Sequence, residues 1–187
     1  MRVLSCLLKV AIAGLAFLVA PAYLMAADVN IPDGWRTPIE GELNAGWRKK
    51  DANQFATVSG DFNGDGIPDE ARLLISLDLQ RFGLFVFLSN NSGRFRTYRL
   101  DIKAGITQLD AMGISKILPG NYKTACGKGY WECGKEEVPT ISVKHDCIEY
   151  FKTESASSYF CWNNQNKSFK RIWISDWRKK HLQLCKW

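Results

Sequence analysis

The segment Gly60–Asp69 combines residue types and a spacing that predict a defined chemistry. Oxygen-bearing side chains stand at positions one, three, five and nine of the loop that starts at Asp61, and Gly66 at position six permits the sharp turn that a wrapping chain needs. The alternate spacing directs successive oxygens toward one cation. The predicted ligands are the side chains of Asp61, Asn63, Asp65 and Asp69 and the backbone carbonyl of Ile67.

Calcium is the cation that this donor set favours, because hard, flexible oxygen coordination suits calcium, whereas zinc prefers nitrogen and sulfur. The ligand order is that of an EF-hand loop, but Arg72 stands at position twelve in place of a bidentate glutamate, and the flanking segments predict strands rather than helices. We therefore expect a structural calcium site in a strand–loop–strand hairpin. The alternative is an acidic turn without a metal.

In this strand–loop–strand setting the loop resembles the calcium loops of FG-GAP and VCBS-type repeats, as in integrin propeller blades. Those families repeat the motif and this chain carries it once, so the resemblance implies a calcium loop but no propeller. A short helix before the loop and the later Cys126–Trp131 segment also look like small exported bacterial proteins of unknown function, which implies no activity. The residues that match the repeats are Asp61, Asn63, Asp65, Ile67 and Asp69, followed by Leu73, Leu74 and Ile75.

The cysteines after residue 27 predict a disulfide scheme. A Cys126–Cys133 bridge would close a short Gly-rich loop, and a Cys147–Cys161 bridge would staple a hairpin centred near Glu154. Cys185 is left over, either free or paired between molecules. A zinc site at the first pair is disfavoured by the six residues between its cysteines.

The Gly-rich loop also carries side chains typical of interfaces, and we consider Lys123, Lys128, Tyr130 and Trp131 as candidates for contact with a partner. The alternative is that the two aromatic residues only pack onto the sheet. The chain contains neither a Gly-x-Ser-x-Gly elbow nor a His-Glu-x-x-His motif, and we predict no catalytic residue.

The elements that must position these residues are short β-like runs separated by turns. The runs are 55–58, 71–77, 84–88, 95–100, 141–143, 148–151, 159–162 and 169–174. The continuous apolar run 84–88 predicts a central strand, and Asn90–Gly93 predicts the turn of a hairpin. We expect a mainly β fold, an antiparallel sheet or sandwich with a short N-terminal helix starting at Thr37, with α+β as the alternative.

The first 26 residues predict a cleaved secretory signal peptide, because Arg2 and Lys9 precede an apolar run that ends in Ala26 and Ala27. Residues 27–187 then form one domain. The chain carries a formal charge of +6, and removing two cations leaves +4, too small an excess to indicate nucleic-acid binding. No second long apolar segment follows, so we expect no transmembrane segment after cleavage.

These features favour a periplasmic or secreted, non-enzymatic binding protein with structural calcium and a protein partner in the cell envelope. Two alternatives stay open. One is an immunity or inhibitor protein directed against a toxin or hydrolase. The other is an envelope polysaccharide hydrolase.

Overall fold

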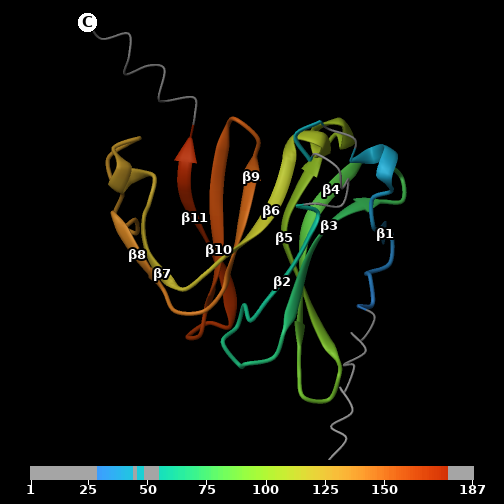
Figure 1. Cartoon of the computed structure of the whole chain (residues 1–187), viewed down its shortest axis with the longest axis horizontal. Coiled ribbons are helices and arrows are strands. Elements are labelled where there is room, and N and C mark those ends of the chain that lie inside the picture. The colour runs from blue at the N-terminus through green and yellow to red at the C-terminus, as the bar shows by residue number, and fades with distance from the viewer. Residues whose placement is uncertain (1–28, 44–45, 49–54, 177–187) are drawn as a thin grey trace, which may run out of the picture.

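The computed structural model describes residues 29–43, 46–48 and 55–176 (Figure 1). The predicted signal peptide, residues 178–181 and Cys185, which the predicted disulfide scheme leaves over, lie outside these residues. Among the described residues, no helix is long and apolar enough to span a bilayer.

The first sheet is built from the N-terminal half of the chain. Its strand order is β1-β3-β4-β5, β2 also pairs with β3, and all pairings are antiparallel. Residues 82–88 of β4 are all buried, as expected for a strand between two neighbours. The strands are β1 (Trp35–Arg36), β2 (Thr57–Gly60), β3 (Asp69–Ser76), β4 (Arg81–Ser89) and β5 (Phe95–Ala104).

The second sheet has the order β11-β10-β9-β6 and is also antiparallel. A separate two-stranded ribbon, β7–β8, is inserted between β6 and β9 and lies to one side of the molecule in Figure 1. The strands are β6 (Met112–Ile117), β7 (Gly120–Lys123), β8 (Thr140–Val143), β9 (Cys147–Lys152), β10 (Ala156–Asn163) and β11 (Ser168–Asp176).

The two sheets share one core. Leu73 and Val86 from the first sheet belong to the same buried apolar cluster as Ile114 and Ile148 from the second. A backbone hydrogen bond from the Ile114 N–H to the Phe55 carbonyl, 2.8 Å long, links the entrance of β2 to β6. The acidic loop after β2 is therefore held by a sheet that is itself attached to the other sheet.

The mainly β prediction is confirmed, as are the central position of β4 and the 90–93 hairpin turn. Strands β6 and β7 were not predicted.

The expected N-terminal helix is reduced to two 3-10 turns, η1 (Glu40–Glu42) and η2 (Gly46–Arg48). Glu42 holds the first turn, because its carboxylate accepts the Ile39 N–H at 2.9 Å and pairs with Arg36. The remaining 3-10 segments are η3 (Ile106–Ala111) and η4 (Cys126–Lys128).

Candidate functional site

The acidic loop is the turn of the β2–β3 hairpin. Gly60 at the end of β2 is the register partner of Asp69 at the start of β3. Both ends of the loop are thereby fixed by the sheet. The predicted strand–loop–strand arrangement is present.

Asp61 organises the first half of the loop. Its Oδ1 accepts the backbone N–H groups of Gly64 at 2.8 Å and Asp65 at 3.1 Å, and its Oδ2 accepts the N–H of Gly66 at 2.9 Å. Gly64 and Gly66 have φ angles of 78° and 82°, in the left-handed region that favours glycine. The chain therefore curls around one carboxylate.

Asn63 and Asp65 extend the same curl. Asn63 Oδ1 accepts the Asp65 N–H at 3.0 Å, and Asp65 Oδ1 accepts the Ile67 N–H at 2.9 Å. The Asn63 side-chain amide also donates to Asp65 Oδ2 at 2.9 Å. These side chains lie together on the exposed part of the loop, so the structure groups three of the predicted ligands.

Asp69 has a different environment, because it is only 2% exposed. Its Oδ2 accepts the Phe62 N–H and its Oδ1 accepts the Ser89 N–H, each at 2.9 Å. Burial raises the pKa of Asp69 to about 6, and the charge of Asp65 acts in the same direction against the lowering effect of the backbone hydrogen bonds. Asp69 therefore ties the loop to β4 as well as closing it.

The donor chemistry of the loop fits calcium in part. A carboxylate oxygen has more than one acceptor site, so an N–H hydrogen bond leaves room for a cation. This applies to Asp61, Asn63 and Asp65 on the exposed part of the loop, whereas Asp69 is buried and its two oxygens accept the N–H groups of Phe62 and Ser89. Within the part of the chain that the structure describes, no three His, Cys, Asp or Glu side chains are grouped as metal ligands.

The second sheet contributes two contacts to the loop that the sequence reasoning missed. The Asp61 N–H donates to Asp146 Oδ2 at 3.2 Å, and the same oxygen lies 3.7 Å from Nζ of Lys116. A Cβ added at Gly64 would lie 2.5 Å from Nδ1 of His145, so this ring packs directly on the loop. Both residues precede Cys147 in the β8–β9 connection, and no local sequence pattern indicates that this connection meets the loop.

Both predicted disulfides are present. Cys126–Cys133 has a Cα–Cα distance of 5.0 Å, and Cys147–Cys161 has one of 4.8 Å. The second bond staples β9 to β10 across the hairpin whose turn contains Glu154, as expected. Two disulfides are typical of proteins in an oxidising compartment.

The four candidate partner-binding residues have separate environments. Lys123 is exposed on β7, whereas Lys128 donates from Nζ to the Ile174 carbonyl at 3.0 Å, and its pKa is lowered by burial. The Trp131 indole donates to the Glu137 carboxylate at 3.0 Å. Tyr130 lines a pocket. The structure therefore does not bring these four side chains together in one surface.

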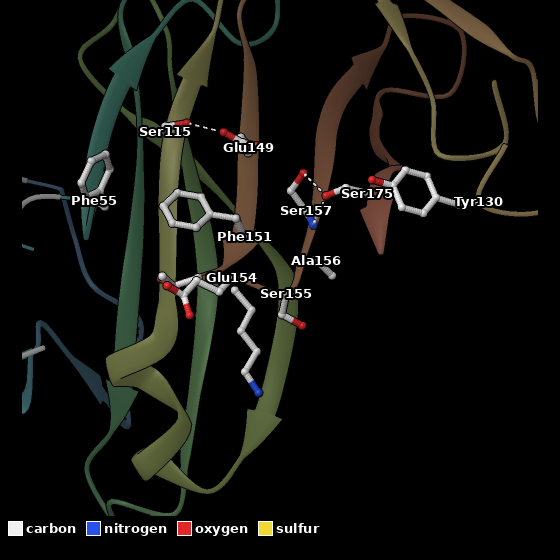
Figure 2. A pocket seen from close by; sticks show the side chains of 12 residues that line it. Phe55, Ser115, Tyr130, Glu149, Phe151, Glu154, Ser155, Ala156, Ser157 and Ser175 are labelled. Carbon is white, nitrogen blue, oxygen red and sulfur yellow. Dashed lines mark hydrogen bonds between the residues drawn. The ribbon is translucent and has the colours of Figure 1, made fainter. Parts of the chain in front are cut away.

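That pocket lies between the β9–β10 hairpin and the Cys126–Cys133 loop and has a volume of about 570 Å³ (Figure 2). Figure 2 shows the hydroxyl end of Tyr130 directed toward Ser175, which hydrogen-bonds with Ser157 at 3.2 Å between their Oγ atoms. On the other side, Ser115 donates to Glu149 at 2.8 Å, close to the ring of Phe151. The pocket combines hydroxyl groups, carboxylates and aromatic rings.

Comparison with protein-family models, curated proteins and solved structures gives no match to this chain.

Proposed function

We propose that this chain is an exported, non-enzymatic binding protein whose β2–β3 loop binds calcium as part of its fold. The observation that carries the calcium assignment is the convergence of Asp61, Asn63 and Asp65 in a loop whose two ends pair as Gly60 and Asp69. Bringing carboxylates together has an electrostatic cost that a divalent cation offsets.

In this proposal Asp61, Asn63 and Asp65 supply side-chain oxygens, the Ile67 carbonyl supplies a backbone oxygen, and Asp69 closes the loop. A bound calcium ion would neutralise the carboxylates and thereby stabilise the hairpin. The loop is anchored to strands on both sides. A sensor EF-hand needs helices that swing apart, so this setting supports a structural role over a switching role.

The binding role is supported by the pocket in Figure 2. Its volume is in the range of small-molecule sites, and its Ser115–Glu149 and Ser157–Ser175 pairs present fixed polar groups beside aromatic rings. The two disulfides support export, because they need an oxidising compartment to persist.

The calcium proposal is tested by titrating the chelator-treated protein, without its first 26 residues, with calcium and with magnesium in a calorimeter. We expect one calcium ion per chain and a higher melting temperature with calcium. At a free concentration of about 100 times Kd, the free energy of unfolding rises by about 2.7 kcal/mol. Absence of calcium binding to the folded protein would refute the assignment.

The binding role is tested separately by affinity capture from an envelope extract, with and without a calcium chelator. We expect a stoichiometric ligand or partner whose retention falls in Tyr130→Ala. Turnover of an envelope glycan by the purified protein would instead favour the hydrolase alternative.

A further inference from the structure

A second candidate site lies where β5 of the first sheet meets β10 and β11 of the second. The rings of Tyr98 and Phe169 have centroids 5.6 Å apart, and Tyr98 also contacts Trp162 at 5.4 Å. Further along β5 and β11, Asp101 Oδ2 lies 3.5 Å from NH1 of Arg171. These contacts link the two sheets over several residues of each strand.

A β-bulge gives β5 one continuous face toward this junction. Strict alternation would place Tyr98 and Asp101 on opposite faces, because side chains alternate with a period of two. The register shifts between Leu84↔Asp101 and Phe85↔Arg99, so one extra residue of β5 is inserted at this point. Arg96, Tyr98, Asp101 and Lys103 therefore share one face.

Two cavities lie along this junction, one toward each end of β5. The first, of about 530 Å³, is lined by Arg96, Tyr98, Trp162 and Lys167, together with Asn63 and Asp65 of the acidic loop. The second, of about 250 Å³, is lined by Lys103, Gln108, Tyr150, Lys152, Arg171 and Trp173. The Tyr98–Trp162 and Asp101–Arg171 contacts lie between the two cavities, and we call the cavities and this stretch together the β5–β11 groove. Its two ends, marked by Arg96 and Lys103, are about 20 Å apart, because their register partners Leu88 and Phe82 are six residues apart on β4 at about 3.3 Å per residue.

The groove has a positive charge excess. Its cationic side chains are Arg96, Lys103, Lys152, Lys167 and Arg171, against Asp65 at one end and Asp101 in the middle. Asp101 is already neutralised, because both Lys103 Nζ and Arg171 NH1 lie 3.5 Å from its Oδ2. The same contacts partly neutralise Lys103 and Arg171, so five cations against two carboxylates leave a net charge of +3, and Arg96, Lys152 and Lys167 are the cations outside the Asp101 cluster. This excess favours anions.

Aromatic rings accompany these cations. Trp173 is 40% exposed, and the guanidinium of Arg171 lies 4.2 Å from the centroid of its ring. Tyr150 lines the second cavity, is 2% exposed and has a hydroxyl group with no hydrogen-bond partner. Burial raises its pKa well above the usual value, so the hydroxyl stays a donor that an acceptor atom of a ligand would satisfy.

We propose that the β5–β11 groove binds an acidic polysaccharide. Arginine and lysine side chains pair with its acidic groups, and the exposed part of the Trp173 ring packs against its sugar rings. A linear polymer suits two cation-lined cavities that follow one another along the same strand. Single-stranded nucleic acid also combines negative charge with stacking, so the test below includes it as a competing ligand.

The test measures binding of the protein without its first 26 residues to polygalacturonate, by calorimetry and tryptophan fluorescence at low and high salt. We expect binding that weakens with salt. The double variant Arg96→Glu/Lys152→Glu reverses one exposed charge in each cavity and should weaken binding at least about tenfold, equivalent to about 1.4 kcal/mol. Lys144→Glu makes the same charge change at an exposed residue just after β8 that lines neither cavity, and it should leave the affinity within about twofold.

A second variant separates sugar recognition from simple charge attraction. Trp173→Ala keeps the charge and should weaken polygalacturonate binding by about fivefold or more, because a stacking surface is lost. Neutral dextran should not bind. The proposal is overturned by absence of polygalacturonate binding, by equal weakening in Lys144→Glu, or by tighter binding to oligothymidylate or to phosphatidylglycerol vesicles. Each measurement is made with calcium and with chelator, so a failure of the calcium assignment leaves this test intact.

Discussion

At the scale of single residues, the carboxylates of the β2–β3 loop divide into two kinds. Asp61 and Asp65 lie on the outer part of the loop and hold its backbone N–H groups, whereas Asp69 is buried and links the loop to Ser89 on β4. Removing Asp69 would leave two buried backbone donors without acceptors. The outer carboxylates are therefore the better positions for testing calcium without disturbing the fold.

We expect Asp65→Ala to weaken calcium binding by about tenfold or more, since a charged ligand is lost. Asp65→Asn keeps the shape and the acceptor for the Ile67 N–H while removing the charge, so it should weaken calcium binding and change the metal-free stability little. Calorimetry and thermal unfolding with and without calcium measure both quantities. Glu132→Ala removes an exposed carboxylate outside the loop and serves as the control. Unchanged affinity in both Asp65 variants would contradict the ligand assignment.

Two glycines of the loop allow a second residue-scale prediction. Gly64→Ala and Gly66→Ala both place a side chain in the left-handed region, which costs about 1–2 kcal/mol. Only Gly64 faces a neighbour. A Cβ added at Gly64 would lie 2.5 Å from His145, whereas a Cβ added at Gly66 would have no other atom within 4 Å. Gly64→Ala should therefore lower the free energy of unfolding by about 1–3 kcal/mol more than Gly66→Ala.

Chemical denaturation in a His145→Ala background checks the cause. Removing the ring should erase the excess cost at Gly64 and leave the cost at Gly66 unchanged. A persisting excess would mean that His145 does not pack on the loop.

At the scale of elements, the β9–β10 hairpin connects most of the features described above. Its first strand follows Asp146, its disulfide staples it, and its turn lines the pocket in Figure 2. The two disulfides differ in what they constrain, because Cys147–Cys161 lies inside the second sheet and Cys126–Cys133 closes a surface loop.

We expect Cys147→Ala/Cys161→Ala to lower the free energy of unfolding by about 3 kcal/mol, as the loop-entropy model gives for a loop of about 15 residues. Cys126→Ala/Cys133→Ala should cost less, because its loop is shorter. Denaturant unfolding measures both, and peptide mapping without reduction identifies the linked fragments. Recovery of Cys126 bonded to Cys161 would contradict the scheme.

The sequence predicted the elements whose patterns are local. The apolar run of β4, the turn at 90–93 and the spacing of Cys147 and Cys161 around Glu154 each depend on neighbouring residues. Strand β6 was missed because Gly113, Ser115 and Lys116 interrupt its apolar pattern, and its burial comes from distant strands. The N-terminal helix was overpredicted, because Gly41 and Gly46 lower the helix propensity of this segment, and its described residues form only the 3-10 turns η1 and η2.

The proximity of the Asp61, Asn63 and Asp65 side chains was predicted for the same reason, since these residues are close in the chain. The contacts of Asp146 and His145 with the loop span about 80 residues, so only the fold creates them. The β5–β11 groove is equally nonlocal, because a bulge in one strand sets which of its side chains face the other sheet.

At the scale of the whole molecule, the loop joins two sheets, and this determines how far the effect of calcium removal should travel. Chelation leaves Asp61 and Asp65 close together and mutually repelling. We expect faster amide exchange at residues 58–72 and at residues 144–146, which contact the loop through Asp146 and His145. The stapled β9–β10 hairpin should stay protected.

Hydrogen exchange followed by mass spectrometry, with calcium and with chelator, measures this pattern. Asp146→Ala/His145→Ala is the matched variant, since it removes both contacts with the loop and should confine the change to residues 58–72. Faster exchange across the Cys126–Cys133 loop with an unchanged melting temperature would instead indicate that calcium regulates a distant surface.

The β7–β8 ribbon leaves the second sheet and returns to it at one place, because Ile117 at the end of β6 is the register partner of Cys147 at the start of β9. The hydrogen-bonded pairing of β6 with β9 therefore does not involve the ribbon. The ribbon is nevertheless docked on β11, because the Ala125 N–H donates to the Trp173 carbonyl at 2.8 Å and Lys128 Nζ donates to the Ile174 carbonyl at 3.0 Å. In engineering terms residues 119–144 are an insertion whose removal would keep the β6–β9 register but uncover the edge of β11.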